Sequence, residues 1–180
     1  MRLNENQNFF TLCRMYILYR EAFPVTERKP FSRILKKRKT GGTQMLAIED
    51  EKGAFLGLAF TICYGDRVLL DYFAIHKNRR AAGAGTEALR LLLDRYKDRR
   101  LVLEIETTKA SKDPDDVFHR RKAFYLRNGL EELPFDVNIY GVEMEMLGNG
   151  CRMTFAEYRE IYEKEYGEFV LPHINLVREW

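Results

Sequence analysis

The first third of the chain changes from a helical period of apolar residues to a strand period. Apolar residues between positions 9 and 23 recur at helical spacing, which predicts an amphipathic helix that ends before Pro24. A second, shorter helix is expected over residues 30–39, with Gly41-Gly42 as its stop. Apolar runs joined by short, turn-like connections then predict antiparallel strands. These strands are expected at residues 44–49, 54–63 and 68–75.

After the third strand, the apolar positions return to a helical period. One apolar face predicts a helix from about residue 85 to 97, and the run at 101–106 predicts a strand directly after it. Another helix is expected to follow, with Asp113 as its N-cap, Pro114 in its first turn and Asn128-Gly129 at its end. The sequence therefore predicts a strand–helix–strand crossover followed by a helix.

The last part of the chain is expected to add more strand and one more helix. Residues 135–147 alternate, but the alternation shifts near Gly141, which predicts a hairpin or a bulge. Thr154 and Glu157 form a capping-box pattern for a final helix that stops at Gly167. The complete order of elements predicts an α+β fold, in which helices flank a mixed, mostly antiparallel central sheet.

Length and charge add two limits. The 180 residues, 46% of them apolar, suit one core, so we expect a single domain over 1–180, with residues 150–180 as an extension packed on it. Thirty basic residues against 27 acidic ones leave a net charge of +3, which supplies no overall field for nucleic acid. Nucleic acid is therefore not an expected partner.

Cysteine usage and hydropathy indicate the compartment. The three cysteines have no C-x-x-C spacing, so they indicate neither a disulfide framework nor a zinc site and favour a reducing compartment. The histidines show no metal-ligand spacing either, and no metal is expected. No apolar run approaches the ~18–20 residues that a membrane span needs, and the polar N-terminal residues do not resemble a signal peptide. A cytoplasmic protein that binds no membrane is expected.

The most informative stretch, residues 70–86, runs from an apolar strand through a basic bend into the start of a helix. Its small residues let the backbone approach a ligand closely. Successive N–H groups at a helix start, together with the helix dipole, form a site for an anion. Lys77, Arg79 and Arg80 add positive charge beside it. This stretch therefore predicts a phosphate or pyrophosphate site.

A dinucleotide-binding interpretation competes for the same glycines. The segment from Gly83 to Ala88 satisfies the pattern G-x-G-x-x-G/A, and Glu104 and Glu106 lie roughly 20 residues further on. That pattern belongs directly after the first strand of a parallel sheet, whereas here residues 76–82 intervene and the preceding strands form a meander. A nicotinamide- or flavin-dependent oxidoreductase is therefore disfavoured. No Gly-Lys-Ser/Thr follows the glycines, so a P-loop is absent too.

Two motifs resemble a different family. The segment from Arg80 to Gly85 matches R/Q-x-x-G-x-G/A, a signature of the GNAT superfamily of N-acetyltransferases. The segment from Phe124 to Leu130 is similar to the family's F-Y-x-x-x-G-F motif, with Leu130 in place of the last Phe. The order of elements from about residue 9 to 147 also resembles this family, in particular its small bacterial members.

This resemblance implies an acetyl-CoA-dependent N-acetyltransferase. An acetyl group would pass directly, in a ternary complex, to a primary amine of a small molecule or peptide. The sheet would splay between its two central strands and admit the pantetheine arm of the cofactor. The resemblance assigns pantetheine and the thioester carbonyl to Phe73, Ala74 and Ile75. It assigns the pyrophosphate to Arg79, Arg80, Ala81, Ala82, Gly83, Ala84, Gly85 and Thr86.

The reaction needs an acid for the departing thiolate and a way to deprotonate the amine. Tyr125 matches the family's tyrosine acid, although packing beside Phe124 would also explain it; a phenol with a pKa of about 10 is protonated at neutral pH. Asp71, Glu104 and Glu106 are candidate bases because they lie on the central strands. Structural ion pairs would explain these acids equally well, and deprotonation through water is a further alternative.

Three features depart from the family pattern or lie outside it. Residues 1–8 leave almost no room for the family's first strand, and Phe118 stands where the family often has an asparagine that contacts the cofactor. The apolar segments 169–171 and 174–177 are expected to supply an edge strand or a dimer contact. The resemblance is compatible with a homodimer. A non-catalytic acetyl-CoA-binding sensor or assembly protein with the same fold is the alternative function.

Overall fold

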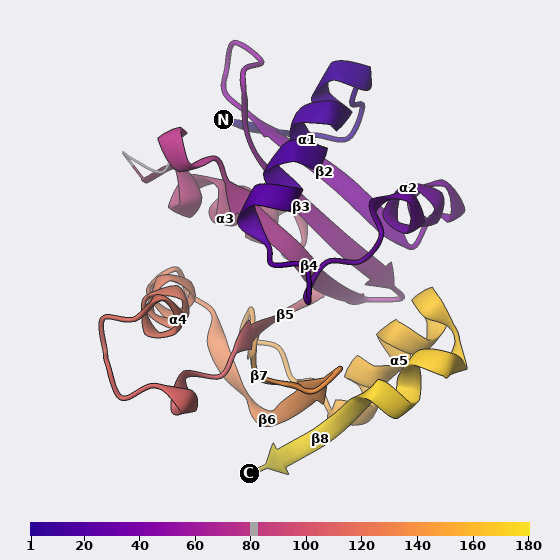
Figure 1. The fold of residues 1–180 in the computed structure, drawn as a ribbon, viewed down its shortest axis with the longest axis vertical. Helices are drawn as coiled ribbons and strands as arrows, with labels where there is room; N and C mark the ends of the chain where they lie inside the picture. Colours follow the sequence, from indigo (N-terminus) through magenta and orange to yellow (C-terminus); the bar gives the residue numbers. More distant parts are fainter. Residues whose placement is uncertain (80–82) are drawn as a thin grey trace. The chain divides into compact units, whose positions relative to one another are not determined.

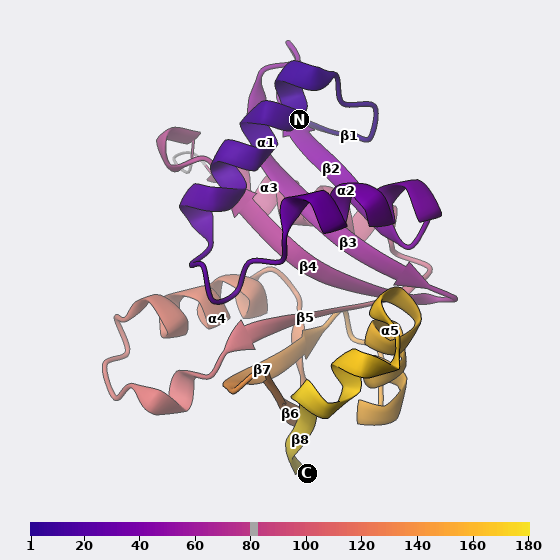
Figure 2. The same cartoon turned by 45° about the vertical axis from the view of Figure 1, so that its right-hand side comes forward.

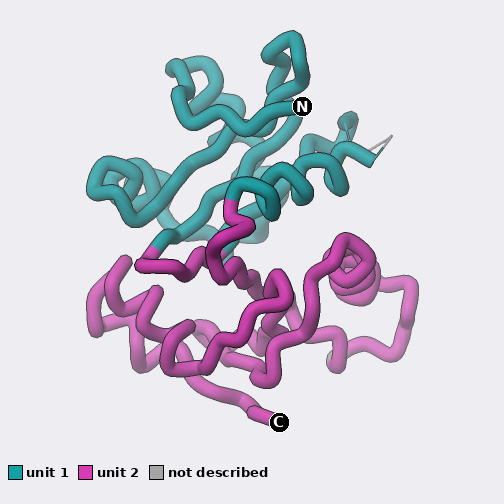
Figure 3. Tube along the Cα trace, turned by 180° about the vertical axis from the view of Figure 1, so that it is seen from behind, with its two compact units in different colours: residues 1–63, 70–95 teal, residues 64–69, 96–180 magenta. Residues whose placement is uncertain are grey.

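The computed structural model describes residues 1–79 and 83–180, which form two compact units (Figure 3). The first unit contains Met1–Cys63 and Leu70–Arg95, and the second contains Tyr64–Leu69 and Tyr96–Trp180. The strand Arg67–Ile75 contributes residues to both. The expectation of a single domain over residues 1–180 stays a prediction.

The first unit is built on antiparallel strands in the order β1-β2-β3-β4 (Figure 1). Helices α1 and α2 cover one face of these strands, and α3 lies on the other face (Figure 2). In chain order the elements are β1 (Arg2–Asn4), α1 (Phe9–Ala22), α2 (Phe31–Thr40), β2 (Thr43–Glu49), β3 (Phe55–Tyr64), β4 (Arg67–Ile75) and α3 (Ala84–Arg95). The two helices and the meander predicted from the sequence are confirmed.

An asparagine starts α1 and a glycine ends α2, and both helices end where the sequence predicts. The side chain of Asn8 accepts a hydrogen bond from the N–H of Thr11 at 2.9 Å and starts α1. The last residue of the helix is Ala22, directly before Phe23 and Pro24. At the end of α2, Gly41 has a φ of 95°, a left-handed conformation that glycine adopts without strain.

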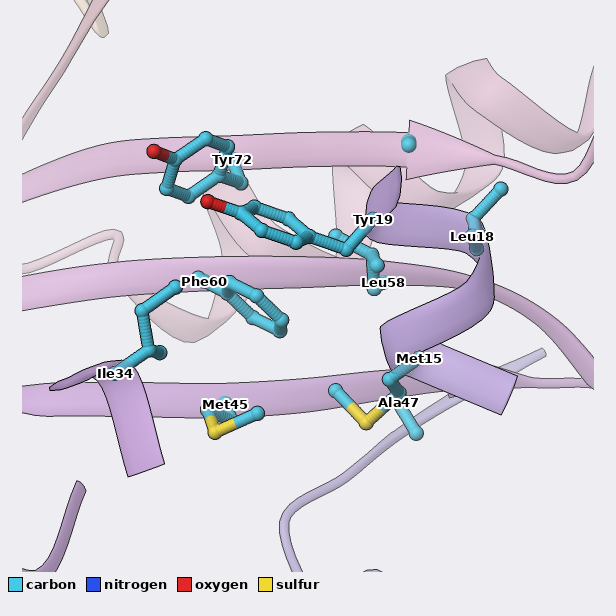
Figure 4. Close-up of a cluster of buried hydrophobic side chains, with 10 residues drawn as sticks. Met15, Leu18, Tyr19, Ile34, Met45, Ala47, Leu58, Phe60 and Tyr72 are labelled. Carbon is cyan, nitrogen blue, oxygen red and sulfur yellow. The ribbon is translucent and has the colours of Figure 1, made fainter. Parts of the chain in front are cut away.

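Aromatic side chains join α1 to the sheet (Figure 4). The ring of Tyr19 lies edge-on to Tyr72 of β4, with centroids 4.8 Å apart, and 5.8 Å from the ring of Phe60 on β3. The Tyr19 hydroxyl donates to the Lys29 carbonyl at 3.0 Å, and the Tyr72 hydroxyl donates to the Glu27 carbonyl at 2.8 Å. Both polar tips are therefore satisfied inside an apolar cluster, and they bind the loop between α1 and α2 to β4.

The N-terminal strand corrects one expectation from the sequence. Residues 1–8 leave room for a strand after all, because Arg2–Asn4 pair antiparallel with β2. The guanidinium of Arg2 and the amide of Asn4 both donate to the buried carboxylate of Glu49, at 2.9 Å each. A strand of only three residues is held in place by side-chain hydrogen bonds as well as by its backbone.

The second unit contains the crossover strand and the C-terminal half of the chain. Strand β5 pairs in parallel with the first three residues of β4 and antiparallel with β7. Strand β6 then lies between β7 and β8, antiparallel to both. The elements are β5 (Arg100–Glu106), α4 (Val117–Arg127), β6 (Glu131–Ile139), β7 (Val142–Gly148), α5 (Phe155–Tyr166) and β8 (Ile174–Glu179). The predicted mixed, mostly antiparallel sheet is confirmed; its splay between β4 and β5 stays a prediction.

The helix ends of the second unit follow the sequence with one correction. Asp116, not Asp113, is the N-cap of α4: its side chain accepts from the N–H of His119 at 2.8 Å, and Pro114 precedes the helix. The predicted capping box of α5 is present, with Thr154 and Glu157 bonded reciprocally. Strand β8 is the predicted edge strand, whereas residues 168–173 form a 3-10 helix. A dimer contact of this segment stays a prediction.

Strands β3 and β4 approach closely at one glycine. A methyl group added at Gly57 would clash with the carbonyl oxygen of Ala74 and lie 3.2 Å from the Cα of Ile75. Ala74 and Ile75 are two of the residues predicted to contact the cofactor. The absence of a side chain at Gly57 therefore sets the position of the end of β4.

We expect Gly57→Ala to lower the free energy of unfolding by about 3 kcal/mol, because the backbone of β4 must shift to accommodate the methyl group. Urea denaturation of the two proteins measures this loss. Gly41→Ala is the control. No described atom lies within 4 Å of a Cβ at Gly41, so only the backbone strain of its φ of 95° applies, and this costs about 1 kcal/mol. Equal losses for the two variants would contradict the close contact.

Candidate active site

The end of β4 carries the residues expected to contact pantetheine. Ala74 and Ile75 are buried, and Phe73 is half-buried. The N–H of His76 donates to the Leu56 carbonyl at 2.8 Å. Strand β4 is therefore bound to β3 up to its last residue, which fixes this strand end within the first unit.

The predicted pyrophosphate loop leads from a single 3-10 turn, Lys77–Arg79, to the start of α3. Gly83 has a φ of 76°, which favours glycine, and no atom of the described residues lies within 4 Å of the position that a Cβ would take. Ala84 and Gly85 are half-buried and Thr86 is exposed. The N–H groups of this first turn have no acceptor within the helix and suit an anion. Three predicted cofactor residues lie outside the described part of the chain: Arg80, Ala81 and Ala82.

Tyr125 lies in the second unit, on the buried side of α4. Its side chain is 8% exposed, and its ring lies 5.2 Å from that of Phe124. Burial raises the pKa of Tyr125 to about 12, against a smaller opposite effect of the Arg121 charge. Among residues 1–79 and 83–180, nothing forms a hydrogen bond with the Tyr125 hydroxyl. The phenol is thus protonated at neutral pH and available to donate.

A buried ion pair holds α4 to β7, one helical turn before Tyr125. The ammonium of Lys122 lies 2.7 Å from the carboxylate of Glu145 and 2.9 Å from that of Glu132. Glu145 also accepts hydrogen bonds from the N–H and hydroxyl of Thr108, at 2.8 and 2.7 Å. Burial by itself would raise the pKa of Glu145, but the hydrogen bonds from Lys122 and Thr108 outweigh it and lower the pKa to about 2.

The three candidate bases have different surroundings. Asp71, in the first unit, forms an ion pair with Lys29 at 2.6 Å. Glu104, in the second unit, accepts hydrogen bonds from the hydroxyls of Tyr158 and Tyr162 at 2.5 and 2.8 Å. Glu106 is half-buried at the end of β5, and its carboxylate has no hydrogen bond or ion pair with any residue that the structure describes. Of the three, Glu106 is the one not engaged in a structural contact.

The predicted residues are thus divided between the two units. The first unit holds Asp71, the end of β4 and the glycine loop, and the second unit holds Tyr125, Glu104 and Glu106. Sequence reasoning did not single out Lys122 or Glu145. Among these two, only Lys122 carried a sequence signal, since it lies three residues before Tyr125 and so shares its helix face. The ion pair itself could not be predicted, because Glu145 comes from a distant strand.

Aromatic residues of α5 were also missed, although the sequence contained a signal. Tyr158, Tyr162 and Tyr166 recur every four residues and therefore share one helix face. Tyr158 and Tyr162 are almost completely buried. Their bonds to Glu104 tie α5 to β5 within the second unit.

A comparison with family models identifies the class of protein as an acyltransferase. Residues 12–124 match the acetyltransferase (GNAT) family. The chain belongs to this family, and the predicted resemblance and enzyme class are confirmed. The dinucleotide-binding alternative is thereby wrong. No curated protein sequence matches the chain significantly.

Solved structures with the same fold include three N-acetyltransferase-type proteins. A protein from Bacteroides thetaiotaomicron, described as an acetyltransferase from the GNAT family, has a TM-score of 0.78 at 20% identity, covering 94% of this chain and 98% of its own. The Escherichia coli ribosomal-protein-S18-alanine N-acetyltransferase has a TM-score of 0.60 at 15% identity, covering 85% and 95%. An aminoglycoside 6'-N-acetyltransferase complexed with coenzyme A has a TM-score of 0.64 at 14% identity, covering 86% and 100%. At these identities the likeness shows the fold alone.

Among the described residues, no helix combines the length and the apolar character that a membrane span requires. Across residues 1–79 and 83–180, no group of three or more His, Cys, Asp or Glu side chains is arranged to hold a metal ion.

We expect Glu145→Gln to lower the free energy of unfolding at neutral pH by about 2 kcal/mol, because Lys122 loses its buried partner. The pKa of Glu145 is lowered in the folded state from 4.5 to about 2, so its contribution is complete above pH 4.5 and is lost as the pH falls toward 2. Urea unfolding at several pH values should therefore show the difference from wild type shrinking in that window.

Glu132→Gln is the matched control for this experiment. Glu132 binds the same ammonium, but its side chain is 44% exposed, so its removal should cost less than about 1 kcal/mol. A loss from Glu145→Gln that is no larger, or that does not depend on pH, would contradict the assigned role.

Proposed function

We propose that this protein is an acetyl-CoA-dependent N-acetyltransferase that acetylates a primary amine of a small molecule or peptide. The observation that carries the proposal is Gly83, with a φ of 76°, at the start of α3 in a chain of the GNAT family. Proteins of the same fold are named for amine substrates, such as the ribosomal-protein-S18 alanine and spermidine. These names support an amine acceptor and leave its identity open.

The cofactor would be held mainly by backbone groups. Free N–H groups at the start of α3 suit the pyrophosphate, and the charges of Lys77 and Arg79 lie on the preceding turn. We assign Arg80, Ala81 and Ala82 to the same loop from the sequence motif. The backbone of Phe73, Ala74 and Ile75 would contact pantetheine and polarise the thioester carbonyl.

Acetyl transfer would proceed by direct attack in a ternary complex. The neutral amine attacks the thioester carbonyl carbon, the C–S bond breaks, and the departing thiolate takes the proton of the Tyr125 hydroxyl. The attacking nitrogen gives up one proton to water to form the amide, and the Tyr125 phenolate regains a proton from water. This role suits Tyr125 because its hydroxyl has no hydrogen bond with the described residues and its pKa of about 12 keeps it protonated.

Glu106 is our choice for the group that deprotonates the incoming ammonium, directly or through a water. Asp71 and Glu104 are less suited, because one oxygen of each is already bound. Oδ1 of Asp71 pairs with Lys29, and Oε1 of Glu104 accepts from two tyrosine hydroxyls. A carboxylate without such contacts can accept a proton without breaking structural bonds.

Acetyl-CoA should stabilise the folded protein, whereas NAD and ATP should not. A ligand that binds only the folded state adds about 2.7 kcal/mol at a concentration ~100 times its Kd. Thermal unfolding with each ligand measures the shift. A shift with NAD that equals or exceeds the shift with acetyl-CoA would contradict the proposed cofactor.

Substitution of the proposed acid and base should lower kcat in two distinguishable ways. Tyr125→Phe should lower kcat about 100-fold at every pH, with little change in the KM for acetyl-CoA, because only the proton donor is lost. Glu106→Gln should lower kcat about 10-fold near neutral pH and approach wild type at alkaline pH, where the amine is already neutral. The assay is thiol release over a pH series with a panel of amines.

Glu143→Gln is the control for the loss of charge, since Glu143 is exposed on β7 in the same unit. Full activity of Tyr125→Phe with every amine would remove the proposed acid. A wild-type protein that binds acetyl-CoA but turns over no amine would instead favour the acetyl-CoA-binding sensor.

A further inference from the structure

A pocket lies in the first unit, beside the turn that leads to the glycine loop. Its volume is about 510 Å³. Three elements form it: helix α1, the turn between β2 and β3, and the residues that follow β4. The argument rests on six of its lining residues, Arg14, Ile17, Leu18, Phe55, His76 and Arg79.

The polar part of this pocket is cationic. Arg14 is exposed on α1 and has no hydrogen bond or ion pair with any described residue. Arg79 and His76 come from the other side, after β4. Guanidinium groups that line one pocket favour an anionic ligand, because carboxylate and phosphate oxygens accept hydrogen bonds from their N–H groups.

One carboxylate lies near these cations, but it is already bound. The side chain of Asp50 accepts hydrogen bonds from the N–H groups of Ala54 and Lys52, at 2.8 and 2.9 Å. The bond from Ala54 is the main reason why the pKa of Asp50 is lowered, and the charge of Arg79 adds a smaller effect in the same direction. Asp50 therefore lies within electrostatic range of Arg79, whereas Arg14 has no ion pair with any described residue.

The rest of the pocket is apolar. Leu18 is buried beneath it, Phe55 is half-buried, and Ile17 remains 55% exposed. The stripe continues along α1, since Phe10 lies one turn before Arg14 and is 74% exposed. Exposed large apolar side chains next to unpaired cations indicate a ligand that has both an anionic end and an apolar body.

We propose that this pocket is a second ligand site, separate from the acetyl-CoA site, for an anion with an apolar body. Arg14 binds its carboxylate or phosphate, and Ile17, Leu18 and Phe55 contact its hydrocarbon part. The two most specific contributors, Arg14 and Ile17, belong to α1 and not to the glycine loop. The inference is therefore independent of the proposed function.

The test uses probes that share one apolar body and differ only in the end group. We expect 3-phenylpropionate and phenethyl phosphate to bind in isothermal titration calorimetry, and the stronger of the two identifies the preferred anion. Phenethyl alcohol lacks the charge, and acetate and inorganic phosphate lack the body. These three should bind at least about tenfold more weakly, because each lacks either the charge-assisted hydrogen bonds or the apolar contacts.

Two substitutions locate the binding. Arg14→Ala and Ile17→Glu should each weaken the better probe by about tenfold or more, the first by removing a cation and the second by placing an anion in the pocket. Arg20→Ala is the matched control, because Arg20 lies on the same helix outside the pocket. All three residues are exposed, so the variants should unfold at the wild-type temperature.

The titrations are first made without cofactor and then repeated with saturating acetyl-CoA. Binding that persists with acetyl-CoA and is lost in Arg14→Ala supports a separate site. Displacement of the probes by acetyl-CoA would overturn the inference, because the pocket would then belong to the cofactor site. Equal binding of phenethyl alcohol, or wild-type affinity in Arg14→Ala, would overturn it as well.

Discussion

The close contact between Gly57 of β3 and the backbone of β4 is the constraint on which the first unit depends. Only a residue without a side chain lets the carbonyl oxygen of Ala74 and the Cα of Ile75 approach β3 so closely. The hydrogen bond from His76 to Leu56 extends this contact to the last residue of β4. The strand end expected to contact pantetheine and the turn that leads to the glycine loop both follow from this packing.

In the second unit, a buried carboxylate and the groups that bind it fix the position of a helix. Glu145 is 2% exposed, and an isolated carboxylate at such a site would be costly. Lys122 and Thr108 compensate by donating to it, and the same bonds fix α4 against β7. Since Tyr125 lies one turn further along α4, a structural ion pair determines where the proposed acid is held.

The three acidic residues on the central strands show how context separates a structural from a chemical role. Asp71 and Glu104 look equivalent to Glu106 in the sequence. In the structure, Asp71 meets Lys29 and Glu104 meets two tyrosine hydroxyls. A carboxylate bound in this way is stabilised as an acceptor and loses those contacts when it takes a proton. Glu106 remains the candidate for proton transfer.

The sequence by itself determined most of the secondary structure and the family, because these depend on local patterns: the apolar period, the capping box at Thr154, and the glycine motif. It failed where the outcome depended on distant partners. The strand Arg2–Asn4 pairs with β2, where the carboxylate of Glu49, far along the chain, accepts hydrogen bonds from the side chains of Arg2 and Asn4. The structural role of Lys122 is apparent only from its ion pair with Glu145. The cationic pocket exists only because α1 packs beside the residues that follow β4. Local propensity fixes elements, whereas pairing of buried charges and pocket shape arise only when remote segments pack together.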